Sequence, residues 1–140
     1  MAKAKTGVLL VNLGTPDSPS VPDVRKYLRE FLMDKRVIDI PFISRWMLVN
    51  LIIAPFRAPK SAKTYKELWE DRGSPLMFHG LDLKDKLVKQ LDEDYVVALG
   101  MRYQSPSIAS ALDELLAANV KKIIVLPLFP QYASATTGSV

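Results

Sequence analysis

Cysteine is absent from the 140 residues, and histidine occurs once, as His79. Without thiols the chain has no disulfide scaffold, thiolate zinc site, cysteine-ligated iron–sulfur cluster or cysteine nucleophile. A lone histidine is more often structural than metal-binding, and no G-x-S-x-G context supports a serine hydrolase. We therefore expect no metal site in this chain and a reducing, cytoplasmic setting.

Long apolar runs are also missing. The longest, residues 46–56, spans eleven residues and is interrupted by Asn50 and Pro55, whereas a membrane-spanning helix needs roughly 20. The N-terminus has no apolar stretch ending in a signal-peptidase site, so no export signal is expected. What is present, 49% hydrophobic and 24% charged residues, is enough for one domain around one core.

Basic residues gather in one part of the sequence. Between residues 35 and 66 seven Lys and Arg side chains face one acidic residue, Asp39, and this stretch surrounds the most apolar segment of the chain. Such a pairing suits an apolar ligand or surface with anionic groups. Nucleic-acid binding more often involves aromatic or glycine residues among the cations. A solvated basic face beside a buried helix explains the pattern equally well.

The order of predicted elements indicates an α/β fold. Continuous apolar runs, typical of strands buried on both faces, are found at residues 7–14, 95–101 and 122–129. Helices are expected after caps at Ser20 and Ser105, and at residues 61–70 and 83–91. Strands that alternate with helices predict a parallel sheet with helices on both faces.

Residues 42–56 look helical but are hydrophobic nearly all round, and Pro55 is expected to break this helix. A helix without a polar face needs cover. Three alternatives stay open: the segment is buried in the core, lines a ligand cleft or lies on a membrane surface.

Parallel sheets bind ligands beyond the carboxyl ends of their strands. Residues 13–16, 102–103 and 130–139 follow the three predicted strands. The first loop lacks the dinucleotide and P-loop spacings, which disfavours nucleotides. Arg102 and Tyr103 either form a buried structural pair or present a cation and a phenol to an anionic ligand. Residues 136–139 either cap a helix or cradle an anion.

Four motifs occur in order along the chain. They are residues 11–16 (VNLGTP), 73–76 (GSPL), 100–103 (GMRY) and 126–139 (LPLFPQYASATTGS). Together they resemble the ferrochelatases, the metal-inserting lyases of haem biosynthesis. Ferrochelatases consist of two similar α/β halves with a porphyrin cleft between them. Residues 1–140 look like the N-terminal, Rossmann-like half-domain, truncated shortly after the fourth motif.

The resemblance places the catalytic groups outside this chain. The family's catalytic histidine belongs to a Ser-x-His-Gly-x-Pro-like motif in the second half, and a catalytic glutamate follows it. Neither motif occurs here, and the neighbours of His79 mark it as a different position. We therefore expect no catalytic residue in this chain, and little or no activity from it alone.

The resemblance also implies porphyrin-binding positions. Leu13 falls where other members place methionine or tyrosine over the porphyrin face, and a leucine cannot ligate iron. Residues of about 40–58 correspond to the family's active-site lip, which in some members touches the membrane. Contacts with the macrocycle, its propionates or the cleft walls are expected from Phe31, Leu32, Arg57, Tyr65, Ser74, Arg102, Tyr103, Gln131 and Tyr132.

The function implied is insertion of ferrous iron into protoporphyrin IX or coproporphyrin III, with iron as a substrate and no cofactor. The expected partners are the porphyrin and the missing C-terminal half, not nucleic acid. The expected location is the cytoplasm, with a peripheral membrane contact through the lip as a further option. A non-catalytic tetrapyrrole-binding module is the alternative, and a chelatase for another metal or a corrin precursor is a third interpretation.

Overall fold

The structure is a computed structural model that describes residues 5–140, so the expectation of no export signal concerns residues that lie partly outside it. Among the described residues no helix is both long enough and apolar enough to cross a membrane. The elements are β1 (Thr6–Asn12), α1 (Val21–Met33), α2 (Phe42–Met47), the π-helical segment η1 (Leu48–Ile53), α3 (Ala54–Leu68), α4 (Pro75–Gln90), β2 (Tyr95–Met101), α5 (Ile108–Ala117), β3 (Lys122–Pro127) and the 3-10 turn η2 (Thr137–Ser139).

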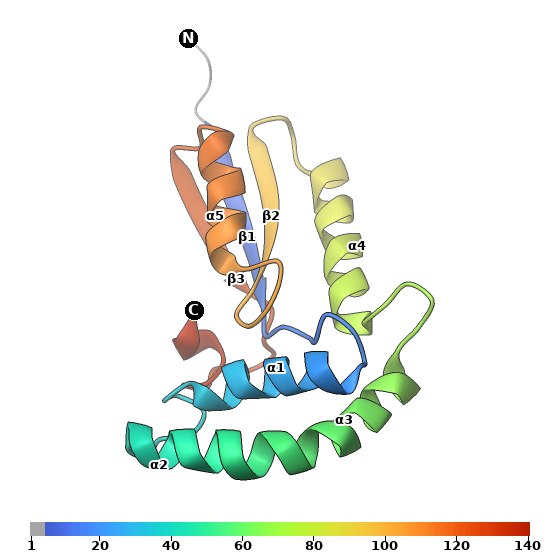
Figure 1. Cartoon of the computed structure of the whole chain (residues 1–140). Coiled ribbons are helices and arrows are strands. Elements are labelled where there is room, and N and C mark those ends of the chain that lie inside the picture. Colours follow the sequence, from blue (N-terminus) through green and yellow to red (C-terminus); the bar gives the residue numbers. More distant parts are fainter. Residues whose placement is uncertain (1–4) are drawn as a thin grey trace.

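The three strands form a parallel sheet in the order β2-β1-β3, which confirms the predicted fold class. Successive residues of β1 point to opposite faces, as strand geometry requires. Leu10 packs on the face covered by α4, and Leu9 packs on the face covered by α5. Figure 1 shows the two helices on either side of the sheet. The sheet core is therefore apolar on both faces, as the continuous runs predict.

A second layer of helices lies beneath the carboxyl ends of the strands (Figure 1). Ser20 caps α1 as predicted, because its hydroxyl accepts the Asp23 N–H at 3.3 Å. Val24 and Leu28 of α1 pack with Ala58 and Ala62 of α3, two small residues that let the helices approach closely. This layer places the C-terminal part of α3 beside the loop after β1, where ligands bind in parallel α/β folds.

The break expected at Pro55 is wrong, because the helix continues through it to Leu68. The segment before it is π-helical, and the Ala54 N–H bonds to the Val49 carbonyl five residues back. A π turn is wider than an α turn, which leaves room for the proline ring. The separate helix expected at residues 61–70 is consequently the second half of α3.

The cap expected at Ser105 lies instead at Ser107, whose hydroxyl accepts the Ser110 N–H at 3.0 Å. The reason is a backbone hydrogen bond: the Met101 N–H donates to the Pro106 carbonyl at 2.6 Å. This bond holds residue 106 beside the end of β2, so the helix cannot begin until it has passed.

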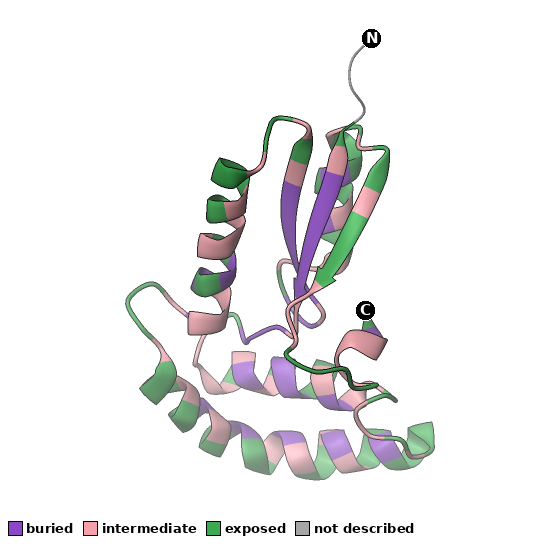
Figure 2. Cartoon of the chain, turned by 180° about the vertical axis from the view of Figure 1, so that it is seen from behind, coloured by how far each residue is buried: buried purple, intermediate pink, exposed green. Residues whose placement is uncertain are grey.

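The third strand was expected to be buried on both faces, and this is wrong. β3 is an edge strand, and Ile124, Val125 and Leu126 are 41%, 46% and 45% exposed. Figure 2 shows this strand in the colour of exposed residues, beside the buried β1. An apolar run predicts a strand that can be buried. It does not reveal whether residues of the same chain pack against both faces of that strand.

Candidate functional site

The loops after the three strands meet at one edge of the sheet. The Tyr103 N–H donates to the Leu13 carbonyl at 2.9 Å, and the Leu128 N–H donates to the Val11 carbonyl at 2.8 Å. Gly14 has φ +117°, and a Cβ there would lie 2.1 Å from the Tyr103 carbonyl oxygen. Only glycine fits this close approach, so the loop after β1 is held rigidly at the site.

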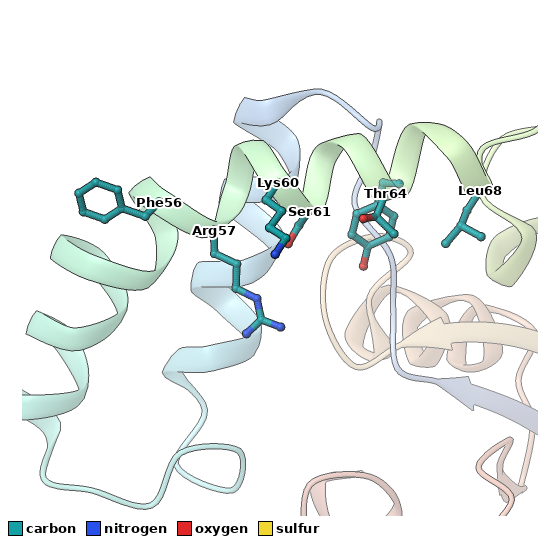
Figure 3. A pocket seen from close by; sticks show the side chains of 7 residues that line it. Phe56, Arg57, Lys60, Ser61, Thr64 and Leu68 are labelled. Carbon is teal, nitrogen blue, oxygen red and sulfur yellow. The ribbon is translucent and has the colours of Figure 1, made fainter.

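A groove of about 780 Å³ runs along α3. Its lining residues are Phe56, Arg57, Lys60, Ser61, Thr64, Tyr65 and Leu68. Arg57 and Lys60 lie three positions apart on the helix, so they share one face, and Figure 3 shows both side chains on that face. Among residues 5–140 neither cation is in a salt bridge. The groove therefore combines an apolar floor with two cations available to a ligand.

Lys60 is a residue that the sequence analysis did not single out. The sequence feature that indicates its role is its spacing from Arg57, because two residues three positions apart on a helix lie on the same face. Within the sequence, Lys60 is one of the seven basic residues of the stretch 35–66.

A second pocket, of about 340 Å³, lies between the end of β1 and the turn before α4. We call it the strand-end pocket, and its lining residues are Leu13, Gly14, Thr15, Tyr27, Tyr65, Leu68, Trp69, Ser74, Pro75 and Leu76. Tyr65 and Leu68 line the groove as well, so the two spaces are neighbours. Four of the predicted site residues, Leu13, Arg57, Tyr65 and Ser74, thus come together here.

Tyr27 and Tyr65 form part of the wall of the strand-end pocket. Their rings meet edge to face with centroids 6.3 Å apart. Burial raises the pKa of Tyr65 and, together with the proximity of Tyr65, that of Tyr27. Both phenols are therefore neutral at physiological pH, and the wall carries no negative charge that would repel an anionic ligand.

Arg102 and Tyr103 bind an internal partner, the carboxylate of Asp34. Arg102 Nη2 lies 2.5 Å from Asp34 Oδ2 and the Tyr103 hydroxyl donates to the same oxygen at 2.9 Å. Arg102 Nε also donates to the Ser139 carbonyl at 2.8 Å, and Tyr103 is 1% exposed. Of the two interpretations left open by the sequence, the structural pair is the one that this geometry favours.

The pKa of Asp34 follows from these contacts. Burial alone would raise it, but the hydrogen bond from the Arg36 backbone N–H, the Tyr103 hydroxyl and the charge of Arg102 together lower it below the ordinary value of 3.8. Asp34 is consequently ionised at neutral pH and offsets the charge of Arg102.

The other predicted positions lie away from the two pockets. Leu32 is buried in the core, and Phe31 packs against Tyr103 with ring centroids 5.2 Å apart. Gln131 and Tyr132 are exposed in the loop after β3, where Tyr132 is 77% exposed. In residues 136–139 the Thr136 hydroxyl accepts the Ala133 N–H at 3.1 Å, so it closes its own turn.

His79 lies on α4, is exposed, and its ring is 4.5 Å from that of Phe78. In the part of the chain that the structure describes, no group of three or more His, Asp or Glu side chains is placed to hold a metal ion. His79 also borders an apolar hollow of about 380 Å³ beside Asn12 and Leu128, which offers a ligand few polar partners.

Comparison with known proteins agrees with the four motifs. The family model for ferrochelatase matches residues 5–140. A ferrochelatase of Coxiella burnetii is 54% identical over 135 residues, and one of Legionella pneumophila is 53% identical over the same length. These alignments cover 96% of this chain but only 38% and 40% of the two relatives, so the chain spans about two fifths of their length. The chain belongs to the ferrochelatase family.

Proposed function

We propose that this chain forms the N-terminal wall and lip of a porphyrin cleft, in a protein that inserts ferrous iron into a dicarboxylic or tetracarboxylic porphyrin. The observation that carries the proposal is the groove along α3 with the adjoining strand-end pocket. Together they offer apolar and aromatic walls with two cations, Arg57 and Lys60, near one end.

A porphyrin is a flat apolar disc with carboxylates at one edge, and it needs a site of the same kind. Tyr65 and Leu68 supply apolar surface shared by both pockets, while Arg57 can hold a carboxylate through two parallel N–H donors. Lys60, one turn further along α3, adds a second positive charge beside Arg57. The neutral Tyr27–Tyr65 pair keeps the wall apolar beside these charges.

Iron insertion also requires a base, because the two pyrrole N–H protons must leave as the metal enters. We assign no residue of this chain to that step. Leu13, at the strand-end pocket, lacks a donor atom for iron, so in this proposal its role is to pack against the macrocycle. The base, and with it activity, belongs to the remainder of the longer protein, and ferrous iron is a substrate.

The remainder of the protein is also the partner that we propose for the exposed edge of the sheet. Ile124, Val125 and Leu126 of β3 form an apolar edge next to the strand-end loops. Relatives are about two and a half times as long as the matched segment, which provides enough chain to cover such an edge.

The lip supports a peripheral contact with a lipid surface. Phe42, Ile43, Trp46, Leu51 and Phe56 are each between 46% and 79% exposed, all on α2, η1 and the start of α3. Arg57 and Lys60 follow directly, and cations beside an apolar helical face are typical of helices that lie on membranes. Through this contact an apolar porphyrin could pass between membrane and cleft.

The test is a fluorescence titration of the 140-residue chain with mesoporphyrin, a dicarboxylic porphyrin. We expect saturable binding that Arg57→Ala and Tyr65→Ala each weaken by roughly five- to tenfold. Lys63→Ala is the matched control, because Lys63 is exposed on the same helix but does not line the groove. Absence of binding by the folded chain, or equal losses in all three variants, would contradict the proposal.

A further inference from the structure

Two buried hydroxyls from distant parts of the sequence meet at the wall of the strand-end pocket. Thr15 Oγ1 donates to Ser74 Oγ at 2.8 Å, although 59 residues separate the two. Thr15 is 5% exposed and Ser74 is 8% exposed, and both line the pocket. A buried hydrogen bond of this kind fixes the orientation of both side chains.

Ser74 occupies the N-cap position of α4, yet its hydroxyl makes no capping hydrogen bond. Serine at this position normally accepts an N–H of the first helical turn. Here the Ser74 backbone carbonyl accepts the N–H groups of Met77 and Phe78 at 3.0 and 3.1 Å, while the hydroxyl turns toward Thr15. The side chain is thus free of the helix and faces the pocket.

The number of hydrogen bonds that the Thr15 and Ser74 hydroxyls can make is limited. A hydroxyl has one hydrogen to donate and two lone pairs that accept. Either hydroxyl of such a pair can donate. With Thr15 as the donor, one lone pair of Ser74 is filled and the hydrogen of Ser74 is available for a ligand. The rings of Tyr27 and Tyr65, which line the same pocket, pack edge to face against each other.

We propose that Thr15 is a positioning residue for porphyrin binding: it orients the Ser74 hydroxyl so that Ser74 donates to a carboxylate of the bound porphyrin. This inference rests on the proposed function and deepens it. Thr15 acts through Ser74 and does not itself touch the ligand's carboxylate.

The position of Thr15 is suited to this role because its backbone is fixed. Gly14 packs directly against the Tyr103 carbonyl, and Thr15 follows it immediately. A serine side chain alone would rotate among three staggered positions. Holding it in one of them before the ligand arrives reduces the entropy lost on binding.

The test compares two porphyrins on the 140-residue chain: mesoporphyrin and its dimethyl ester, which lacks the carboxylate charge. Thr15→Val keeps the shape of the side chain and removes its hydroxyl. We expect this variant to raise the Kd for mesoporphyrin roughly three- to tenfold and the Kd for the ester less than twofold, because a hydrogen bond to a charged acceptor is the stronger one. Thr15→Ser should restore binding of mesoporphyrin to within about twofold.

Ser74→Ala completes a double-mutant cycle. If Thr15 acts through Ser74, Ser74→Ala weakens mesoporphyrin binding by a similar factor and the double variant binds no more weakly than the single ones. Circular dichroism and a urea midpoint establish that each variant is folded, and Thr15→Ala replaces Thr15→Val if the valine variant does not fold.

Three outcomes would overturn the inference. Equal losses for the acid and the ester would mean that Thr15 only maintains the structure of the pocket. A loss in Ser74→Ala without one in Thr15→Val would leave Ser74 as a contact but remove Thr15 from the mechanism. Failure of the unaltered chain to bind either porphyrin would refute the proposed function itself, and the inference with it.

Discussion

The guanidinium of Arg102 lies 2.5 Å from the carboxylate of Asp34, although 68 positions separate the two residues. Arg102 follows β2 and Asp34 follows α1, so this ion pair joins the helical layer to the sheet. The side chains are 28% and 12% exposed, and the Tyr103 hydroxyl donates to the same carboxylate oxygen. Asp34 is therefore the common partner of a partly buried cluster that links the end of α1 to the end of β2.

Removal of the Asp34 charge should destabilise the fold. Asp34→Asn keeps the shape of the side chain but leaves Arg102 without its counter-ion, and we expect the free energy of unfolding to fall by about 1–2 kcal/mol. Urea denaturation measures this. Asp17→Asn is the control: its partner Lys26 lies 3.4 Å away with side chains 46% and 63% exposed, and such pairs contribute roughly 0–1 kcal/mol. Equal effects of the two substitutions would contradict a special role for Asp34.

The acid limb of the stability curve should depend on the same residue. The pKa of Asp34 is lower in the folded chain than its ordinary value of 3.8. Its contribution is therefore present above pH 3.8 and is lost as the pH falls through the folded pKa. The stability difference between the unaltered chain and Asp34→Asn should shrink as the pH drops below about 4. Urea midpoints measured from pH 6 to pH 2.5 give this difference directly. A stability difference that stays constant over this range would contradict the role of the Asp34 carboxylate.

Tyr103 reports on the cluster at alkaline pH. Burial, the hydrogen bond to Asp34 and the charge of Asp34 raise its pKa from 10.0 to about 12. The neutral phenol is favoured in the fold, so its contribution to stability is complete below pH 10 and is lost as the pH rises to about 12. In Asp34→Asn the pKa of Tyr103 should fall but stay above 10, because its burial remains. Phenolate absorbance at 295 nm follows this titration. The signal of Tyr103 is the difference from the Tyr103→Phe variant, made both in the unaltered chain and in Asp34→Asn. An unchanged pKa of Tyr103 would show that Asp34 does not act on it.

Much of the fold can be predicted from short stretches of sequence, because hydrophobic spacing and helix caps depend on neighbouring residues. The apolar residues of β1 are continuous, and the Ser20 cap precedes an α1 with clear helical spacing. The errors come from interactions that local patterns do not contain. Pro55 does not end the helix, because a π turn precedes it, and the helix after β2 begins at Ser107, because the Pro106 carbonyl is bonded to strand β2.

The candidate site was predictable mainly through the family resemblance that the motifs carry. Arg57, Tyr65 and Ser74 form no local pattern in the sequence, and only the resemblance to a family implied that they contact the porphyrin or its propionates. The partner of Arg102 could not be found in this way: Asp34 lies in a connector with no motif of its own. The Thr15–Ser74 hydrogen bond could not be predicted either, because each residue alone is typical of a turn.

Gly14 should be far less replaceable than Gly73, although both have positive φ angles. Gly14→Ala meets the Tyr103 carbonyl at 2.1 Å, whereas a Cβ at Gly73 has no atom within 4 Å. We expect Gly73→Ala to cost about 1 kcal/mol from backbone strain and Gly14→Ala to cost roughly 3 kcal/mol or more, because the loop must also move. Urea denaturation of the two variants compares them. A similar loss in both would mean that the loop after β1 is not held against Tyr103.

The lip should bind lipid vesicles through its most exposed apolar side chains. Ile43 is 72% exposed and Phe56 is 79% exposed, so Ile43→Ser with Phe56→Ser removes apolar surface without opening the core. Because each buried apolar side chain contributes about 1.5–3 kcal/mol, partitioning into phosphatidylglycerol-containing vesicles should fall tenfold or more in the double variant. Trp46, also on the lip, remains as a fluorescent probe whose emission shifts to the blue on insertion. Leu116→Ser is the control, since Leu116 is 60% exposed on α5, away from the lip. Retention of vesicle binding by the double variant, or an equal loss in Leu116→Ser, would show that the exposed lip does not form the membrane contact.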